Sequence, residues 1–226
     1  MKNKNSTVSS NLVTYFDKTS IISEAYRSLS TNIQYTSVDE EVKSILITSS
    51  SIKEGKTVTA CNLAIVMANT EKRVLLLDAD LRKPNIHNQF KILNHIGLTN
   101  ILLSENSIEE SIKKNDDIKN LDIITSGILP PNPLEIVASK KMKQFLHDVT
   151  KIYDIIIIDS PPIGYVSDAL ILSGYVDGVI LTVAIKETNI GQAYNAVKQL
   201  KNVKANILGS VVTKKEKKLH KQYYYN

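Results

Sequence analysis

Ser50, Gly55, Lys56 and Thr57 are spaced as in a phosphate-binding loop, with serine in place of the first glycine of that motif. Small residues in such a loop let backbone N–H groups point at phosphate groups, and the following helix adds the positive end of its dipole. We expect Lys56 to reach the β- and γ-phosphates of a nucleotide and the Thr57 hydroxyl to bind Mg²⁺. The residues expected to contact the nucleotide are Ser51, Ile52, Lys53, Glu54, Gly55, Lys56, Thr57 and Val58.

The surroundings of this loop favour a nucleotide site over a plain strand, turn and helix with a surface lysine. The loop follows the apolar run Ile45–Ile47 and opens an apolar helical face that extends to Met67. A phosphate-binding loop requires a strand before it and a helix after it, and the sequence predicts both.

Acidic residues end two other apolar runs. Asp78, Asp80 and Arg82 follow one run, and Asp159 follows four isoleucines and has the form of a Walker B carboxylate, which holds the hydration shell of Mg²⁺. Ligands of doubly wound sheets bind outside the carboxyl ends of the strands, so these side chains should face the nucleotide. Mg²⁺ suits the carboxylates and phosphate suits the arginine, whereas the alternative is a pair of acids in a solvated turn. Asp168, at the start of a short helix, either supports the metal indirectly or caps the helix.

The elements that must position these residues alternate between strands and helices. This order predicts an α/β protein with a Rossmann-like P-loop NTPase fold, in which a mostly parallel sheet carries helices on both faces of a single domain. Asn132 is the predicted N-cap, and Pro133 the first-turn residue, of one helix that runs to about Thr150. Strands are expected within 43–49, 73–84, 120–125, 153–162, 178–184 and 206–213, and further helices at 20–35, 56–67 and 188–201.

The whole-chain composition is that of an ordinary soluble protein of 226 residues, with 42% hydrophobic and 23% charged residues. No apolar run approaches the roughly 18 residues that span a bilayer, and the first residues lack the apolar core of a signal peptide, so we expect a cytoplasmic protein. The single cysteine, Cys61, is expected to be a buried packing thiol.

The net charge of +5 lies mostly at the end of the chain. Residues 214–226 hold five lysines and one glutamate, a net charge of +4, so a DNA-binding face is not indicated and no nucleic-acid partner is expected. Three tyrosines, Tyr223, Tyr224 and Tyr225, follow these lysines, and flexible tails usually lack aromatic residues. We divide the chain into a flexible N-terminal segment (1–19), the P-loop domain (20–213) and a flexible basic tail with a tyrosine cluster (214–226).

The phosphate loop, LLLDADLR, IIIIDSPP and the terminal tyrosines together resemble the bacterial tyrosine kinases, specifically the cytoplasmic kinase subunit of capsular and exopolysaccharide systems. The blocks SEAYRSLSTNIQY, GLTNILL, SGILPPNPLEI and ILGSVV strengthen the resemblance. It implies ATP with Mg²⁺ as phosphoryl donor and the tail tyrosines of a neighbouring subunit as acceptors. It also implies self-association into a homo-oligomer, of which a ring is one form. A separate membrane-spanning polysaccharide co-polymerase would be the adaptor that recruits the kinase to the inner face of the membrane. A cognate tyrosine phosphatase is a further candidate partner.

The resemblance also assigns roles to site residues. Lys56 would hold phosphates, while Thr57, Asp80 and Asp159 would position the metal. Asp78 would be the base toward the incoming phenol and Arg82 a stabiliser of the transferred charge, so that the catalytic residues would be Asp78, Lys56 and Arg82.

Three departures from the family pattern accompany this resemblance. The assembly motif Glu-x-x-Arg-x-x-Arg is present as Glu24, Arg27 and Ser30, which is expected to weaken a ring-like homo-oligomer. Lys53 replaces a usual glycine, so an ordinary backbone conformation is expected there, with a side chain that either crowds the loop or adds a phosphate contact. Thr213 stands where an asparagine commonly meets adenine, which leaves base selectivity open.

Two other functions remain open from the sequence. One is an ATPase switch of the partitioning or site-positioning class, which needs no acceptor tyrosines. The other is a nucleotide-binding regulatory subunit without kinase activity, which Ser30 and Lys53 keep open. The tyrosine cluster favours the kinase.

Overall fold

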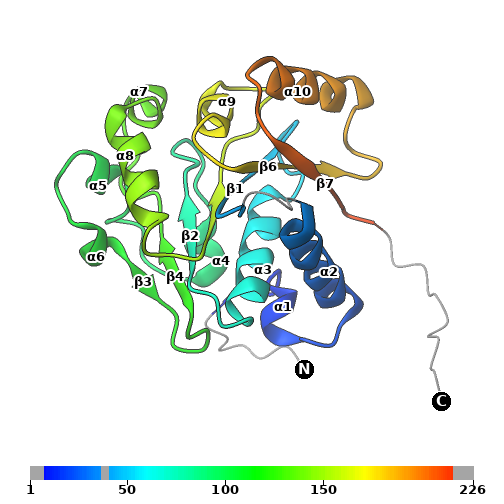
Figure 1. Cartoon of the computed structure of the whole chain (residues 1–226), viewed down its shortest axis with the longest axis horizontal. Helices are drawn as coiled ribbons and strands as arrows, with labels where there is room; N and C mark the ends of the chain where they lie inside the picture. Colours follow the sequence, from blue (N-terminus) through cyan, green and yellow to red (C-terminus); the bar gives the residue numbers. More distant parts are fainter. Residues whose placement is uncertain (1–7, 37–40, 216–226) are drawn as a thin grey trace.

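The chain folds around a seven-stranded sheet with the strand order β3-β4-β2-β5-β1-β6-β7 (Figure 1). The computed structural model describes residues 8–36 and 41–215. Neighbouring strands run parallel, except for the antiparallel pair β3 and β4 at one edge. The strands are β1 (Ser44–Ser49), β2 (Val74–Asp78), β3 (Lys113–Lys114), β4 (Leu121–Ile124), β5 (Ile155–Asp159), β6 (Gly178–Ala184) and β7 (Ile207–Thr213).

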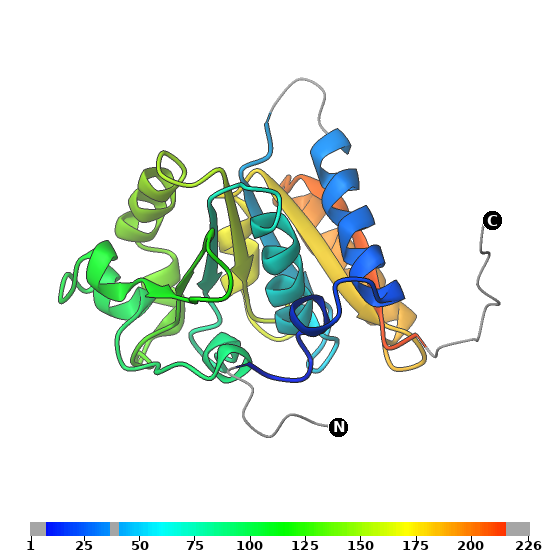
Figure 2. The same cartoon turned by 90° about the horizontal axis from the view of Figure 1, so that it is seen from below.

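Helices cover both faces of the sheet, and each face has its own apolar core (Figure 2). Helices α1 to α4 pack on one face and α5 to α10 on the other. None of the helices within the described ranges is long and apolar enough to cross a membrane. The helices are α1 (Val13–Phe16), α2 (Ile21–Thr36), α3 (Lys56–Ala68), α4 (Ile86–Phe90), α5 (Leu98–Leu102), α6 (Ile108–Ser111), α7 (Pro133–Val137), α8 (Lys140–Val149), α9 (Asp168–Ser173) and α10 (Ile190–Asn202).

The four isoleucines of β5 show why this central strand carries consecutive apolar residues. Ile155 and Ile157 belong to the core on the α3 face, whereas Ile156 and Ile158 belong to the core on the opposite face. Successive side chains of a strand point to opposite faces, so a strand covered on both sides places apolar residues on both faces in a near-continuous run. The predicted doubly covered, mostly parallel sheet is therefore confirmed.

The strand order brings the phosphate loop and the acidic strand ends together at the carboxyl ends of the central strands. Strand β5 lies between β2 and β1, and Asp78 at the end of β2 is in register with Asp159 at the end of β5. Ile47 of β1 is also in register with Asp159, and the phosphate loop follows β1 directly. The carboxyl ends of these three strands thus form the floor of the predicted site.

Two helices, α7 and α8, replace the single helix expected from Asn132 to Thr150. The Ser139 hydroxyl accepts the backbone N–H of Met142 at 3.1 Å and caps a new helix there. Serine side chains compete with the helical backbone for hydrogen bonds, so this position ends one helix and begins the next. Pro133 lies in the first turn of α7 as predicted, but the Asn132 side chain makes no capping hydrogen bond.

Residues 8–19 pack against the domain, so the prediction of a flexible N-terminal segment is wrong for this part of it. Val8 and Leu12 are fully buried in the core on the α3 face. The Thr14 backbone N–H and hydroxyl both donate to Asn62 Oδ1 of α3, at 3.1 and 2.8 Å. The rest of the segment, residues 1–7, lies outside the described residues. Residues 216–226 of the tail also lie outside them.

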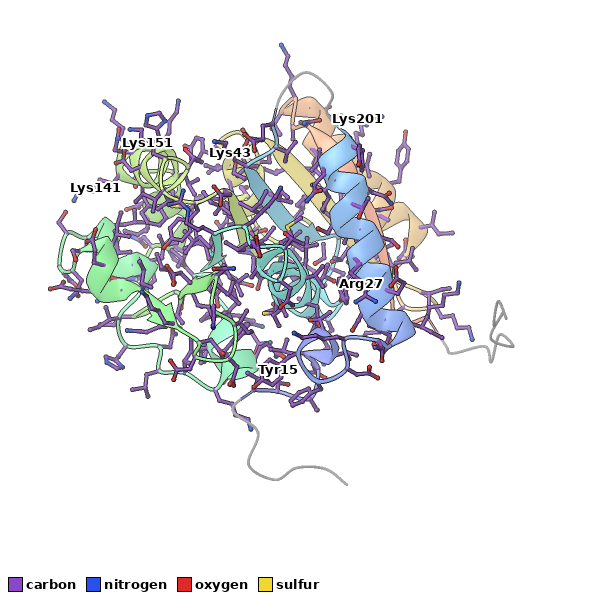
Figure 3. All side chains as sticks on the ribbon, turned by 60° about the horizontal axis from the view of Figure 1, so that its bottom comes forward. Tyr15, Arg27, Lys43, Lys141, Lys151 and Lys201 are labelled. Atoms are coloured by element: carbon purple, nitrogen blue, oxygen red, sulfur yellow. The ribbon has the colours of Figure 1, made fainter. Side chains whose placement is uncertain are left out.

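Helix α2 carries the residues of the altered assembly motif. Arg27 lies near the beginning of α2 (Figure 3), where its Nε donates to Glu24 Oε2 at 2.9 Å and its Nη1 donates to the Lys18 backbone carbonyl at 2.6 Å. Ser30 is buried, with 4% of its surface exposed. The weakening of self-assembly stays a prediction, and the structure adds that Glu24 and Arg27 pair within one chain.

We predict that Asn62→Ala lowers the free energy of unfolding by about 1 to 3 kcal/mol, because buried donors of Thr14 lose their acceptor. Chemical denaturation measures this change. Asn88→Ala is the matched control, since the exposed Asn88 side chain donates to Asn85, three residues earlier in the chain. Equal stabilities of the two variants would contradict the anchoring role of Asn62.

Candidate active site

The phosphate loop connects β1 to α3 through two residues with left-handed backbone. Gly55 has a φ of 87°, and a Cβ placed on it would come within 3.2 Å of the Thr213 side chain, so glycine is required there. Lys53 has a φ of 62°, which corrects the expectation of an ordinary backbone conformation. A non-glycine residue in this region costs roughly 1–2 kcal/mol, so the surrounding loop must hold Lys53 in place.

Lys56 begins α3 and reaches two carboxylates. Its Nζ lies 2.8 Å from Asp80 Oδ2 and 3.5 Å from Asp159 Oδ1. Burial alone would lower the pKa of Lys56, but the charges of Asp159 and Asp80 outweigh burial and raise the pKa above its ordinary value. Lys56 is therefore a permanent cation at the start of a helix, as the phosphate-binding role requires.

Thr57 and Asp159 form the part of the site that suits Mg²⁺. The Thr57 hydroxyl donates to Asp159 Oδ2 at 2.6 Å, and Asp159 is fully buried. Burial raises the pKa of Asp159, and the nearby Lys56 and Thr57 act against this rise. Mg²⁺ prefers oxygen ligands and in nucleotide sites binds one or two protein side chains together with phosphate oxygens. A hydroxyl and a carboxylate at hydrogen-bond distance fit this ion, and the Lys56 ammonium that contacts Asp159 also donates to Asp80 Oδ2 at 2.8 Å.

Asp78 is fully buried and held by backbone amides. Its Oδ2 accepts the N–H groups of Asn85 and Ile86 at 3.1 and 3.0 Å. Burial and the neighbouring Asp159 carboxylate raise the pKa of Asp78 to about 8. A carboxylate with a pKa near neutrality is suited to accept a proton, so the structure is compatible with a base at this position.

Arg82 points to a partner that sequence reasoning did not identify. Its Nε and Nη2 donate to the two oxygens of Asp168, at 2.5 and 3.1 Å. Asp168 is buried, whereas 37% of the Arg82 side chain is exposed. Asp168 thus orients Arg82. The sequence had suggested that Asp168 supports a metal indirectly or caps a helix, and the pairing with Arg82 was not foreseen. The apolar residues that follow Asp168 signal its burial, and a buried carboxylate needs a cationic partner.

Glu54 was predicted only as a member of the loop, yet its side chain is 3% exposed and hydrogen-bonded inside the protein. Its carboxylate accepts the Ser51 N–H at 2.9 Å and the Thr188 hydroxyl. Cys61 is fully buried, and burial raises the pKa of its thiol, in agreement with the predicted packing role.

Comparisons with known proteins place this geometry in a family. The model of the AAA domain family matches residues 42–211. Tyrosine-protein kinase YwqD of Bacillus subtilis is 42% identical, covering 99% of this chain and 94% of YwqD. Putative tyrosine-protein kinase CapB of Staphylococcus aureus is 33% identical, covering 100% of this chain and 98% of CapB. The chain belongs to the bacterial tyrosine kinase family.

The structure agrees with this membership. The solved kinase domain of Escherichia coli tyrosine kinase ETK matches it with a TM-score of 0.87 at 27% identity, covering 100% of this chain and 88% of that domain. The membership classes the chain with the protein-tyrosine kinases, and it confirms the resemblance drawn from the motifs. The roles of individual residues of this bacterial tyrosine kinase stay predictions.

We predict that the stability of this bacterial tyrosine kinase falls as the pH rises from about 4 to about 8. The pKa of Asp78 is about 8 in the folded protein, whereas an unfolded chain titrates its aspartates near about 3.9. The folded state therefore binds the extra proton within this window and loses that advantage as the pH rises through the folded pKa.

The measurement compares wild type with Asp78→Asn by urea unfolding without nucleotide at several pH values. The wild type should lose stability relative to the variant, by up to about 1.4 kcal/mol per pH unit. Asp116→Asn, at an exposed aspartate, is the control and should run parallel to wild type. Parallel curves for wild type and Asp78→Asn would show that Asp78 does not hold this proton.

Proposed function

We propose that this chain is an ATP-dependent protein-tyrosine kinase that phosphorylates Tyr223, Tyr224 and Tyr225 of a neighbouring copy. The observation that carries the proposal is the convergence of Lys56, Thr57 and Asp159 at the carboxyl ends of parallel strands. The similarity to proteins named as tyrosine-protein kinases, at up to 42% identity, supports it over an ATPase switch or a regulatory subunit.

The residues of the site have distinct tasks in this proposal. Lys56 holds the β- and γ-phosphates, and the loop backbone from Ser51 to Val58 surrounds them. Thr57, Asp80 and Asp159 hold Mg²⁺, which supplies neutralising charge to the phosphates when it is bound. Side chains placed in this way can position the phosphates and neutralise their charge, which are the main requirements of phosphoryl transfer.

The transfer step forms a bond between a tyrosine oxygen of the acceptor and the γ-phosphorus, and breaks the bond between that phosphorus and the oxygen that leaves with ADP. The phenol proton passes to Asp78, whose raised pKa suits this exchange. Arg82, oriented by Asp168, stabilises the charge of the transferred group.

We infer the cellular setting by analogy with the family. We place the kinase in capsular or exopolysaccharide synthesis and export, with a membrane-spanning polysaccharide co-polymerase as its adaptor. The adaptor recruits it to the inner face of the cell membrane, and a cognate tyrosine phosphatase reverses the modification. Self-association presents the tail of one copy to the site of another.

We predict that Lys56→Met lowers tyrosine phosphorylation by at least about 100-fold and weakens ATP binding, because the site loses its buried cation. The assay incubates purified protein with γ-labelled ATP and a peptide of the adaptor's cytoplasmic end. Label in the wild-type protein supports the kinase. Free phosphate alone would indicate an ATPase, and neither product would indicate a binding subunit.

A mixing experiment tests transfer between copies. The acceptor is the Lys56→Met variant, and the kinase carries phenylalanine at Tyr223, Tyr224 and Tyr225. Label should appear on the tail of the acceptor, at a rate that rises with protein concentration. Label that forms only within wild-type chains, independent of concentration, would show that each tail serves its own site.

A further inference from the structure

Glu54 places a carboxylate inside a loop whose task is to bind phosphate groups. Its Oε1 and Oε2 lie 2.9 and 3.0 Å from the Ser50 hydroxyl, and Oε2 accepts the Ser51 N–H at 2.9 Å. The Thr188 hydroxyl donates to Oε1. A buried negative charge at this place repels phosphate, so its presence requires a compensating structural effect.

The backbone on either side of Glu54 indicates what this effect is. Lys53 and Gly55 both have positive φ angles, 62° and 87°, and the Glu54 side chain is buried between them. The loop therefore turns sharply on both sides of this residue. The three donors that converge on the carboxylate hold it in this conformation despite the strain at Lys53.

The bonds of Glu54 also extend beyond the loop. Thr188 accepts the Ala184 N–H at 2.7 Å and so joins the β6–α10 connection to the carboxylate. The Thr213 hydroxyl donates to the Glu54 backbone carbonyl at 2.7 Å, and the Thr213 carbonyl accepts the Ile185 N–H at 3.1 Å. Glu54 thus contacts the end of β7, from which the basic tail continues.

We propose that Glu54 is a positioning residue that holds the phosphate loop in its nucleotide-binding shape and couples this shape to the β6–α10 connection and to the end of β7. The inference rests on the proposed function in that the loop binds a nucleotide. It assigns to the Glu54 side chain a role other than direct phosphate contact.

The direction in which Glu54→Gln changes the affinity for ADP separates a positioning role from a purely electrostatic one. Glu54→Gln removes a negative charge, so electrostatics alone predicts tighter ADP binding. Glutamine offers one acceptor oxygen to the Ser50, Ser51 and Thr188 donors, so a positioning role predicts binding weakened by about five- to tenfold. Thr188→Val removes one donor to the carboxylate, together with the acceptor of the Ala184 N–H, without a change of charge. It should weaken ADP binding in the same direction by a smaller factor.

The experiment titrates the full-length protein with ADP and Mg²⁺ by calorimetry, and circular dichroism verifies that each variant is folded. Glu187→Gln is the matched control, because Glu187 is exposed, lies beside Thr188 and pairs with Lys214. It carries the same charge change and should bind ADP as wild type does. Hydrogen exchange of residues 184–188 should slow when ADP binds wild type, and this protection should decrease in Glu54→Gln.

Tighter or unchanged ADP binding by a folded Glu54→Gln protein would overturn the inference, as would unchanged ADP-dependent protection of residues 184–188. If Glu54→Gln does not fold, normal ADP binding and normal protection in Thr188→Val would overturn it. Wild type that binds ADP without phosphorylating tyrosine would refute the kinase and leave the Glu54 result valid. Wild type that binds no ADP would refute both.

Discussion

The ammonium group of Lys56 lies between carboxylates from two strands, Asp80 after β2 and Asp159 at the end of β5, and both carboxylates are buried. With Asp78, three carboxylates share this one lysine in a space from which water is largely excluded. Neighbouring carboxylates disfavour one another's ionised forms, so the three can all be ionised only with a further positive charge beside them. A proton on Asp78 relieves this repulsion in the free protein, and Mg²⁺ with a nucleotide would relieve it in the complex.

This electrostatic cluster depends on the strand order. Because β5 lies between β1 and β2, the ends of these strands bring residues from distant parts of the chain together. The apolar runs that make this possible can be recognised in the sequence, since a strand covered on both faces is apolar over most of its length. The break between α7 and α8 could not be predicted from the sequence, because Ser139 acts as an N-cap only where its backbone is extended.

The candidate site was predictable where a motif fixes the role of a residue. Lys56 and Asp159 follow apolar strands at positions that topology forces together. The pairing of Arg82 with Asp168 joins residues 86 positions apart, and no local pattern specifies it. The left-handed conformation of Lys53 was missed for a similar reason, because contacts of the loop with distant segments override the ordinary preference of a lysine.

The basic tail begins beside the phosphate loop, because the hydroxyl of Thr213, the last residue of β7, donates to the Glu54 backbone carbonyl of that loop. The same loop carries Lys56, which contacts Asp80 and Asp159. Residues 214–226 have a net charge of +4, so on the proposed function the site would attract the tail of a neighbouring copy before transfer. Each phosphoryl group adds about −1.5 to −2 charges, and two or three modified tyrosines cancel or reverse the charge of the tail. On the proposed function, the product is therefore repelled by the site that formed it, and the same charge that recruits the acceptor makes its release depend on phosphorylation.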